Sequence, residues 1–331
     1  MSFVPVVDVS HHQGAIDFVT MRRRGIDDLI IRVTNGDTHD KQAHAYYLGA
    51  VAAGFDPRRI LWYTFVNPKR CTAFQAVTAT LDRIRQITGR DDHALMWDCE
   101  TFTGEAGTRG PGEIKGAEYA NYMRSLMAGV HRLAPNWRQF GYSNAAFWDS
   151  WVGLHGDDIV ASLEWIVARY PVHSDAGYDK YPVPGDPDEW AAWAFARQSK
   201  GPLPPRGAPW SGWQFSADFN GMGRYYGCSS SALDLNIVQL DPWLRWTGRT
   251  AAPEPEEPDM PQANPRYFRT PASPTAVWGT TDGFHAFKVT HDAAQARIAA
   301  GFPFDVEVLN ADEAKLFDYI DSAEHGTIGI A

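Results

Sequence analysis

The sequence predicts an α/β fold built on an irregular (β/α) barrel of about eight strands. Short apolar runs alternate with amphipathic stretches over most of the chain, which is the pattern of parallel strands joined by helices. The number and spacing of these runs fit a barrel. Acidic residues stand near the ends of several runs, where α/β folds build their active sites. A doubly wound open sheet is the alternative, because the predicted helices become short or absent in the second half.

The predicted strands are short apolar runs bounded by turn residues. In chain order they cover Val4–Ser10, Asp28–Thr34, Ile60–Val66, His93–Asp98, Arg138–Tyr142, Ser162–Ala168, Trp210–Phe215 and Ala232–Ile237.

The predicted helices are stretches with helical spacing of apolar residues, several of them closed by a glycine such as Gly54 or Gly89. They cover Ile16–Gly25, Asp37–Ala53, Thr72–Ile87, Glu113–Leu133, Ala145–Trp151 and Asp188–Gln198. The segment Tyr170–Pro209 interrupts the alternation and is rich in Pro, Gly and Asp, so we interpret it as an insertion on the loop face of the barrel.

The composition divides the chain into three parts. Residues 1–248 hold the barrel, and residues 249–265 form a linker rich in Pro and acidic residues. Residues 266–331 are predicted to form a small α+β module for attachment or targeting. Its predicted strands are Thr275–Trp278, Ala286–Val289 and Asp305–Val308, and its predicted helices are His291–Ala300 and Ala311–Ile320.

The stretch Ala94–Glu100 is the centre of the functional prediction. It begins as a buried strand and ends in Asp98 and Glu100, which share a face because side chains alternate along a strand. Asp8 and Asp234 stand at the ends of the first and last predicted strands, so a barrel brings all four acids to one mouth. Two carboxyl groups in such a mouth can differ in pKa, so that one stays protonated and the other ionised. Cleavage of a glycosidic bond requires such a pair. The alternative is an acidic loop edge that faces solvent.

Aromatic residues fall at the same strand ends as the acids. Flat rings beside carboxylates favour carbohydrate chemistry over metal chemistry, because such rings can stack on sugar faces. These residues are Tyr63, Tyr142, Trp165, Tyr170 and Trp213. No His pair stands at a metal-binding spacing, so a site made only of carboxylates is the remaining metal alternative.

The charge and the cysteine content limit the partners and the cellular compartment that can be expected. The net charge of −10 argues against a nucleic-acid partner. Cys71, Cys99 and Cys228 match neither a disulfide framework nor a zinc pattern, so we expect reduced thiols made in a cytosol. No secretory signal and no membrane-spanning run is predicted, so no membrane partner is expected.

Eight short motifs together resemble the glycoside hydrolase family 25 lysozymes, the muramidases of phage lysins, bacteria and some fungi. In order along the chain, the matching motifs are Asp8–Gly14, Ile30–Thr34, Tyr63–Phe65, Asp98–Glu100, Gly141–Asn144, Trp165–Tyr170, Trp213–Ser216 and Leu233–Asn236. Cys99 departs from the aliphatic residue that is commoner between the two acids. The C-terminal module resembles neither choline-binding nor SH3-like wall-binding repeats.

The resemblance implies an irregular barrel that cleaves the β-1,4 bond between N-acetylmuramic acid and N-acetylglucosamine in peptidoglycan. It assigns Glu100 as general acid, with Asp98, Asp8 and Asp234 as the other acids of the cleft. The sugar subsites would be shaped by Tyr63, Tyr142, Trp165, Tyr170 and Trp213, with Gln214 positioning a polar group of the substrate. No cofactor and no metal are expected.

A phage lysin would be made in the host cytoplasm and act at the bacterial cell wall, either released at lysis or carried in the particle. The C-terminal module would then bind a host wall polymer or phage structural proteins. The alternative function is a virion- or surface-associated component that binds glycan with little or no turnover.

Overall fold

The computed structural model describes residues 2–100, 114–171, 182–217 and 222–249, together with four short strands beyond residue 265. Contacts divide the chain into two compact units, residues 1–251 and 252–331, so the boundary falls inside the predicted linker. Apart from Arg249, that linker lies outside the described residues.

The first unit is a closed barrel of eight strands, which confirms the predicted fold class and excludes the open sheet. Its strands are β1 (Phe3–Val9), β2 (Leu29–Asn35), β4 (Ile60–Phe65), β5 (Ala94–Asp98), β6 (Arg138–Ser143), β7 (Trp165–Ala168), β8 (Gly212–Ser216) and β9 (Asp234–Gln239). They follow the order β1-β9-β8-β7-β6-β5-β4-β2, and pairing of β1 with β2 closes the ring. Strand β9 is antiparallel to both of its neighbours, whereas the other pairs in the ring are parallel.

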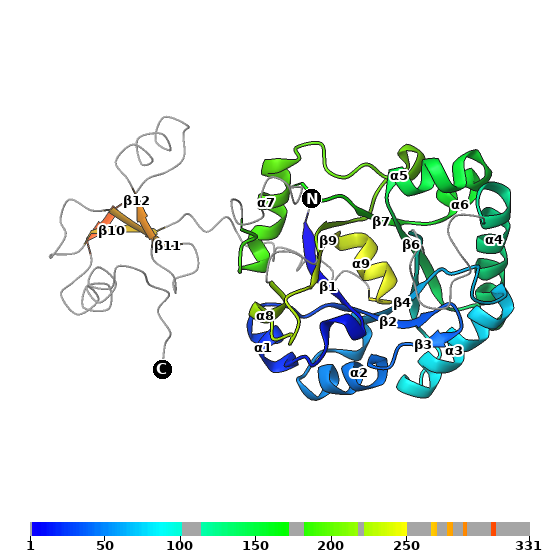
Figure 1. The fold of residues 1–331 in the computed structure, drawn as a ribbon. Helices are drawn as coiled ribbons and strands as arrows, with labels where there is room; N and C mark the ends of the chain where they lie inside the picture. Colours follow the sequence, from blue (N-terminus) through cyan, green and yellow to red (C-terminus); the bar gives the residue numbers. More distant parts are fainter. Residues whose placement is uncertain are drawn as a thin grey trace. The chain divides into compact units, whose positions relative to one another are not determined.

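The helices of the first unit lie around the barrel, except α9, which lies inside the ring of strands in the view of Figure 1. In chain order they are α1 (Phe18–Arg23), α2 (Ala43–Ala52), α3 (Ala73–Thr88), α4 (Gly116–Leu133), α5 (Ala145–Phe147), α6 (Asp157–Ser162), α7 (Trp190–Arg197), α8 (Met222–Tyr225) and α9 (Leu240–Trp246). Helix α3 has the clearest end signals. Thr72 and Gln75 form a capping box at its start, and Gly89 takes the left-handed conformation at its end, with a φ of 66°.

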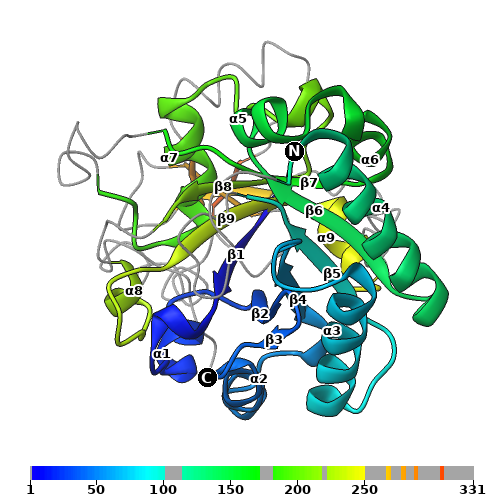
Figure 2. The same ribbon diagram turned by 45° about the vertical axis from the view of Figure 1, so that its right-hand side comes forward.

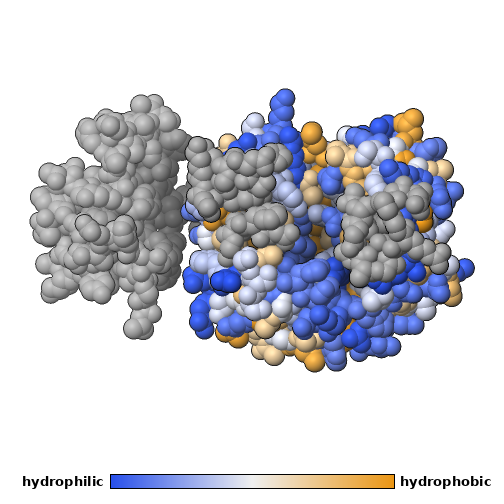
Figure 3. Space-filling model, viewed as in Figure 1, coloured by the Kyte–Doolittle hydropathy of each residue, from blue (hydrophilic) through white to orange (hydrophobic). Residues whose placement is uncertain are grey.

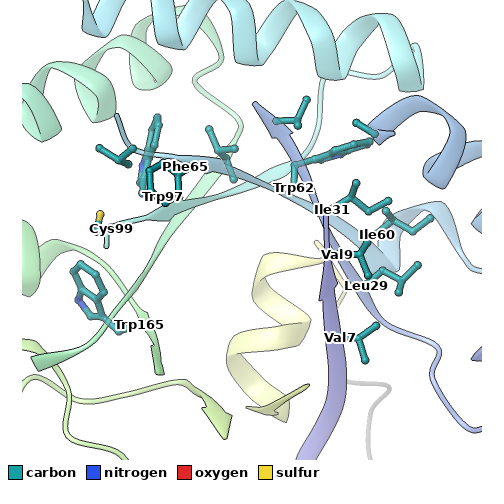
Figure 4. Packing of buried hydrophobic residues seen from close by; sticks show 14 of the residues in the cluster. Val7, Val9, Leu29, Ile31, Ile60, Trp62, Phe65, Trp97, Cys99 and Trp165 are labelled. Carbon is teal, nitrogen blue, oxygen red and sulfur yellow. The ribbon is translucent and has the colours of Figure 1, made fainter. Parts of the chain in front are cut away.

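The barrel has an inner and an outer apolar layer. The inner layer includes Val6, Ile30 and Met96, and α9 adds Trp243 and Trp246, which close the floor of the barrel. The outer layer packs the opposite faces of the strands against the surrounding helices. Figure 4 shows Trp97, Cys99 and Trp165 pointing from their strands toward those helices.

One predicted helix is wrong at its start. The sequence pattern predicts a helix over Asp37–Ala53, but a two-residue strand, β3 (Thr38–His39), pairs with the end of β2 before α2 begins at Ala43. Hydrogen bonding of the Asp40 backbone N–H to Val33 O at 2.8 Å holds the turn between β3 and α2. Tertiary pairing therefore overrides the helical pattern in this segment.

The second unit contains a four-stranded sheet in the order β12-β11-β10-β13. Three strands overlap predicted ones: β11 (Val277–Thr280), β12 (Phe287–Val289) and β13 (Val306–Val308). Strand β10 (Arg266–Arg269) was not predicted. The two helices predicted in this module lie outside the described residues.

The surface of the described residues is mostly polar. Figure 3 shows hydrophilic residues over much of the face seen in Figure 1, with hydrophobic residues scattered in small groups. Cys71, Cys99 and Cys228 are free thiols. Among the described residues, none of the helices is both long enough and apolar enough to cross a membrane.

Candidate active site

A cleft of about 460 Å³ opens at the mouth of the barrel, where the parallel strands end. Carboxylates, phenols and amides dominate its lining. All four acids predicted from the sequence line this cleft: Asp8, Asp98, Glu100 and Asp234. The predicted residues Tyr63, Tyr142, Tyr170 and Gln214 also line it. The segment that follows the acid pair, residues 101–113, lies outside the described residues.

Asp234 reaches the cleft by a route that the sequence analysis did not predict. It is the first residue of β9, not a residue at the end of a parallel strand. Because β9 is antiparallel, its start lies beside the end of β1, and Asp234 pairs in register with Asp8. An antiparallel strand begins where its parallel neighbours end, so the predicted convergence holds although the predicted strand direction was wrong.

A hydrogen-bonded chain fixes Asp8. Its Oδ2 atom accepts hydrogen bonds from Gln214 Nε2 at 3.0 Å and from Asn236 Nδ2 at 2.9 Å. Gln214 Oε1 in turn accepts from the hydroxyls of Tyr142 at 2.8 Å and Tyr170 at 2.7 Å. The two phenols therefore determine which way the Gln214 amide points, and the amide presents its N–H to Asp8. Both ends of the Gln214 amide therefore have partners within the protein.

Asp98 lies in an environment that disfavours its charged form. It is 6% exposed, and its Oδ1 atom is buried with no hydrogen-bond partner among the described residues. Burial raises the pKa of Asp98 well above its ordinary value. The neighbouring carboxylates of Glu100, Asp8 and Asp234 add to this rise, and the guanidinium of Arg32 opposes it. A buried carboxyl of this kind resists ionisation.

Glu100 lies two residues beyond Asp98, just past the end of β5, and it is half-buried. The backbone before it is fixed by two hydrogen bonds. Cys99 N–H donates to Tyr142 O at 2.9 Å, and Ser143 Oγ donates to Cys99 O at 2.7 Å. The Cys99 side chain points into the outer layer, with its Sγ 3.8 Å from Met123 Sδ, as the alternation of side chains predicts. The two acids of the pair are therefore held on a rigid strand end.

Two predicted subsite residues do not lie in the cleft. Trp165 and Trp213 are fully buried in the outer layer. Trp165 donates its indole N–H to Val160 O at 3.0 Å, and its ring lies so close to Gly141 that a Cβ there would be 2.5 Å from the ring. Trp213 donates to Arg169 O at 2.6 Å.

The physical reason for this correction is the alternation of side chains along a strand. Trp213 is adjacent to Gln214 on β8, so the two side chains cannot both face the cleft. On β7 the inward residue is Ile166, which belongs to the inner layer, and its neighbour Trp165 must point outward.

Sequence reasoning gave no role to several residues of the cleft. The most informative is Arg32, whose side chain is only 8% exposed and lines the cleft from β2. The sequence signal that could have identified Arg32 is a charged residue inside an otherwise apolar strand. Ser10, His12, Gln13, Phe65, Met96 and Ser230 also line the cleft. No group of three or more His, Cys, Asp or Glu side chains among the described residues is placed to hold a metal ion.

Comparisons with known proteins agree with this architecture. The bacterial lysozyme of Streptomyces coelicolor is 18% identical, with a TM-score of 0.50 over 76% of this chain and 100% of that one. The family GH25 lysozyme of Aspergillus fumigatus is 17% identical, with a TM-score of 0.50 over 75% and 100%. The CTP1L endolysin is 16% identical, with a TM-score of 0.50 over 74% and 69%. At these identities the likeness establishes a shared fold.

None of the curated protein sequences matches this chain significantly. The family model of the glycosyl hydrolases family 25 matches residues 7–223, a segment that contains Asp8, Asp98 and Glu100 and ends before Asp234. This chain therefore belongs to glycosyl hydrolase family 25 and is a glycoside hydrolase.

Proposed function

We propose that the chain is a peptidoglycan hydrolase of the muramidase type, which cleaves the β-1,4 bond between N-acetylmuramic acid and N-acetylglucosamine. The observation that carries this proposal is the convergence of Asp8, Asp98, Glu100 and Asp234 in one cleft of a family 25 barrel. Bacterial and fungal structures with the same fold are named lysozymes, which supports this choice of substrate.

Glu100 is the proposed general acid. Cleavage of a glycosidic bond requires a proton on the leaving oxygen. Burial, and after it the neighbouring Glu100 carboxylate, oppose ionisation of Asp98 and raise its pKa. Glu100 is only half-buried and lines the cleft, whereas Asp98 is buried. Glu100 is therefore the member of the acid pair from which a substrate can take the proton.

The other three acids stabilise the positive charge that develops on the sugar ring as the bond breaks. Asp8 suits this role because Gln214 and Asn236 each donate an N–H to one of its oxygens. These hydrogen bonds favour the ionised carboxylate and hold it in one orientation. Asp234 lies opposite Asp8 in the strand register.

Asp98 has two possible routes of action. It attacks the sugar directly, or it orients the N-acetyl group of the substrate for attack. Replacing the N-acetyl groups by N-trifluoroacetyl groups distinguishes the routes, because the weaker carbonyl nucleophile slows the substrate-assisted route much more than direct attack.

The sugar subsites are proposed to be formed by Tyr63, Tyr142 and Tyr170. All three phenols line the cleft beside the acids. Tyr142 and Tyr170 both donate their hydroxyls to Gln214, so their side chains meet on one wall of the cleft.

The proposed place of action is the bacterial cell wall, reached either after release at lysis or from a phage particle. Residues 266–331 are proposed to bind a host wall polymer or a phage structural protein. Retention of the full chain on purified walls, before and after removal of wall polymers, tests the first of these partners.

The experiment that tests the function measures new reducing ends released from purified peptidoglycan. The wild-type chain is compared with Glu100→Gln, which keeps the shape of the side chain and removes the ionisable acid. Glu189→Gln, an exposed glutamate preceding α7, is the matched control. We expect wild type and control to release muramic-acid reducing ends equally, and Glu100→Gln to lose roughly 10²-fold or more.

Three other results would contradict the proposal. Glucosamine at the new reducing ends would show that the opposite glycosidic bond is cut. Full activity in Glu100→Gln would remove Glu100 as the acid. Wild-type binding to peptidoglycan without release of reducing ends would leave a glycan-binding component of a virion or surface as the function.

A further inference from the structure

Arg32 is a buried cation in an acidic cleft. It lies in the middle of β2 between apolar neighbours, and it is the only Arg or Lys among the described residues that line the cleft. Burying a guanidinium is costly unless hydrogen bonds and an opposite charge compensate. The surroundings of Arg32 must therefore contain a built-in partner.

That partner is Asp40, whose side chain is 1% exposed. Arg32 Nε donates to Asp40 Oδ2 at 3.0 Å, and the same oxygen accepts the backbone N–H of His11 at 3.1 Å. The other oxygen accepts the backbone N–H of Gln42 at 2.9 Å. The ring Nδ1 of His11 lies 2.9 Å from Asp40 Oδ2 and also contacts the Arg32 guanidinium.

Asp40 itself is held rigidly and does not line the cleft. The turn between β3 and α2 fixes its backbone, and its carboxylate has partners on both oxygens. Although burial alone would raise the pKa of Asp40, the bonds from Gln42, His11 and Arg32 together hold that pKa below its ordinary value. The carboxylate is therefore charged over the working pH range and anchors the guanidinium.

Arg32 acts electrostatically on Asp98. Its strand is separated from β5 by β4 alone, and Arg32 pairs in register with Tyr63 while Asp98 pairs with Phe65. The positive charge lowers the pKa of Asp98 against the stronger effect of burial. The titratable groups that face Arg32 are Tyr63 of β4, Asp98 of β5, and Asp40 and His11 behind it.

We propose that Arg32 is a positioning residue whose guanidinium acts on the Asp98 carboxyl from β2, and that Asp40 and His11 fix the guanidinium for this task. The role rests on the proposed function, because it concerns the same acid pair. It assigns a purpose to two residues, Asp40 and His11, that lie outside the acid set.

The test measures the titration of the Asp98 carboxyl by ¹³C NMR in the full chain, with the signal identified through Asp98→Asn. Arg32→Gln removes the charge and is expected to raise the Asp98 midpoint by about one pH unit or more. Arg32→Lys keeps the charge and is expected to leave the midpoint near the wild-type value. An unchanged midpoint in folded Arg32→Gln would overturn the proposal.

A double-mutant cycle tests the part played by Asp40. If Asp40 fixes the guanidinium, the shift caused by Arg32→Gln becomes smaller in an Asp40→Asn background. The matched control is Asp28→Asn, which alters a second buried aspartate–arginine pair at the floor of the barrel and should leave the shift unchanged. Equal shifts in all three backgrounds would overturn the anchoring role.

The titration remains informative if Arg32→Gln does not fold, and also if the wild-type chain shows no turnover. If Arg32→Gln alone does not fold, the Arg32→Gln/Asp40→Asn double variant removes both charges together, and its Asp98 midpoint is compared with that of Asp40→Asn. The NMR measurement needs no turnover. Absence of released reducing ends from wild type would therefore overturn the proposed function while the titration still decides the role of Arg32.

Discussion

Two buried aspartate–arginine pairs lie at opposite ends of the barrel. At the floor, Asp28 precedes β2 and accepts from Arg59 Nε at 2.6 Å. At the mouth, Asp40 follows β3 and accepts from Arg32 Nε at 3.0 Å. Both carboxylates are 1% exposed, whereas Arg59 is 27% exposed and Arg32 only 8%. The same two residue types therefore form a partly exposed pair at the floor of the barrel and a more deeply buried pair beside the cleft.

The pKa values of the two aspartates shift in opposite directions. Burial raises the pKa of Asp28, and the hydrogen bonds from Arg59 and from Trp243 Nε1 at 2.7 Å only oppose that rise. Burial also acts on Asp40, but two backbone N–H groups, His11 and Arg32 outweigh it and lower the pKa. A buried carboxylate beside an arginine can therefore shift in either direction, depending on whether its hydrogen bonds and neighbouring charges outweigh the effect of burial.

The largest effect is expected from breaking the floor pair. Asp28→Ala leaves Arg59 and the indole N–H of Trp243 without their acceptor, and should cost about 3–5 kcal/mol of unfolding free energy. Urea denaturation measures this loss. Activity per folded molecule should stay at the wild-type level at a temperature where the variant is folded. A loss of activity in the folded variant would show that the floor pair also supports catalysis, which would contradict the difference drawn between the two pairs.

The mouth pair should respond differently. Asp40→Asn is expected to cost about 1–3 kcal/mol at neutral pH and to lower kcat by about tenfold or more, because the guanidinium loses its anchor. The pKa of Asp40 is lowered in the folded state, so its stabilisation is present above the unfolded value of 3.8 and is lost as pH falls through the folded pKa. The stability gap from wild type should therefore close below about pH 4. A gap independent of pH would contradict the assignment.

A third buried carboxylate sharpens the comparison, because Asp98 has one oxygen without a partner. Its pKa is raised in the folded state, so the folded chain is destabilised as pH rises through that value. Asp98→Asn should therefore raise the unfolding free energy by about 1–2 kcal/mol at neutral pH while activity falls. The gain should disappear at low pH, where Asp98 is protonated, and thermal unfolding at several pH values checks this.

Much of the fold was predictable because strand and helix signals are local. The runs around β1, β2, β4 and β5 carry turn residues at both ends, and α3 has capping signals at both ends. Short helices such as α6 and α9 gave no comparable signal. Helix α9 exists because its tryptophans fill the barrel floor, and this is a tertiary cause that no local pattern shows.

The acids of the cleft were predictable from strand ends, whereas their supporting residues were not. Nearly every residue of β7 and β8 is buried on one face or the other, so the sequence does not reveal which face of these strands is the interior. This ambiguity placed Trp165 and Trp213 in the cleft in error. The contact between His11, Arg32 and Asp40 joins three separate segments, and only the folded barrel brings them together.

The chain from Tyr142 and Tyr170 through Gln214 to Asp8 gives the cleft a definite hydrogen-bond polarity. Both phenols direct their hydroxyl hydrogens to Gln214, so only their lone pairs remain for a ligand. Ionised carboxylates offer lone pairs as well. The phenols and ionised carboxylates of this wall therefore present hydrogen-bond acceptors. They complement a ligand that carries hydrogen-bond donors, such as an amino sugar with its hydroxyls and amide N–H.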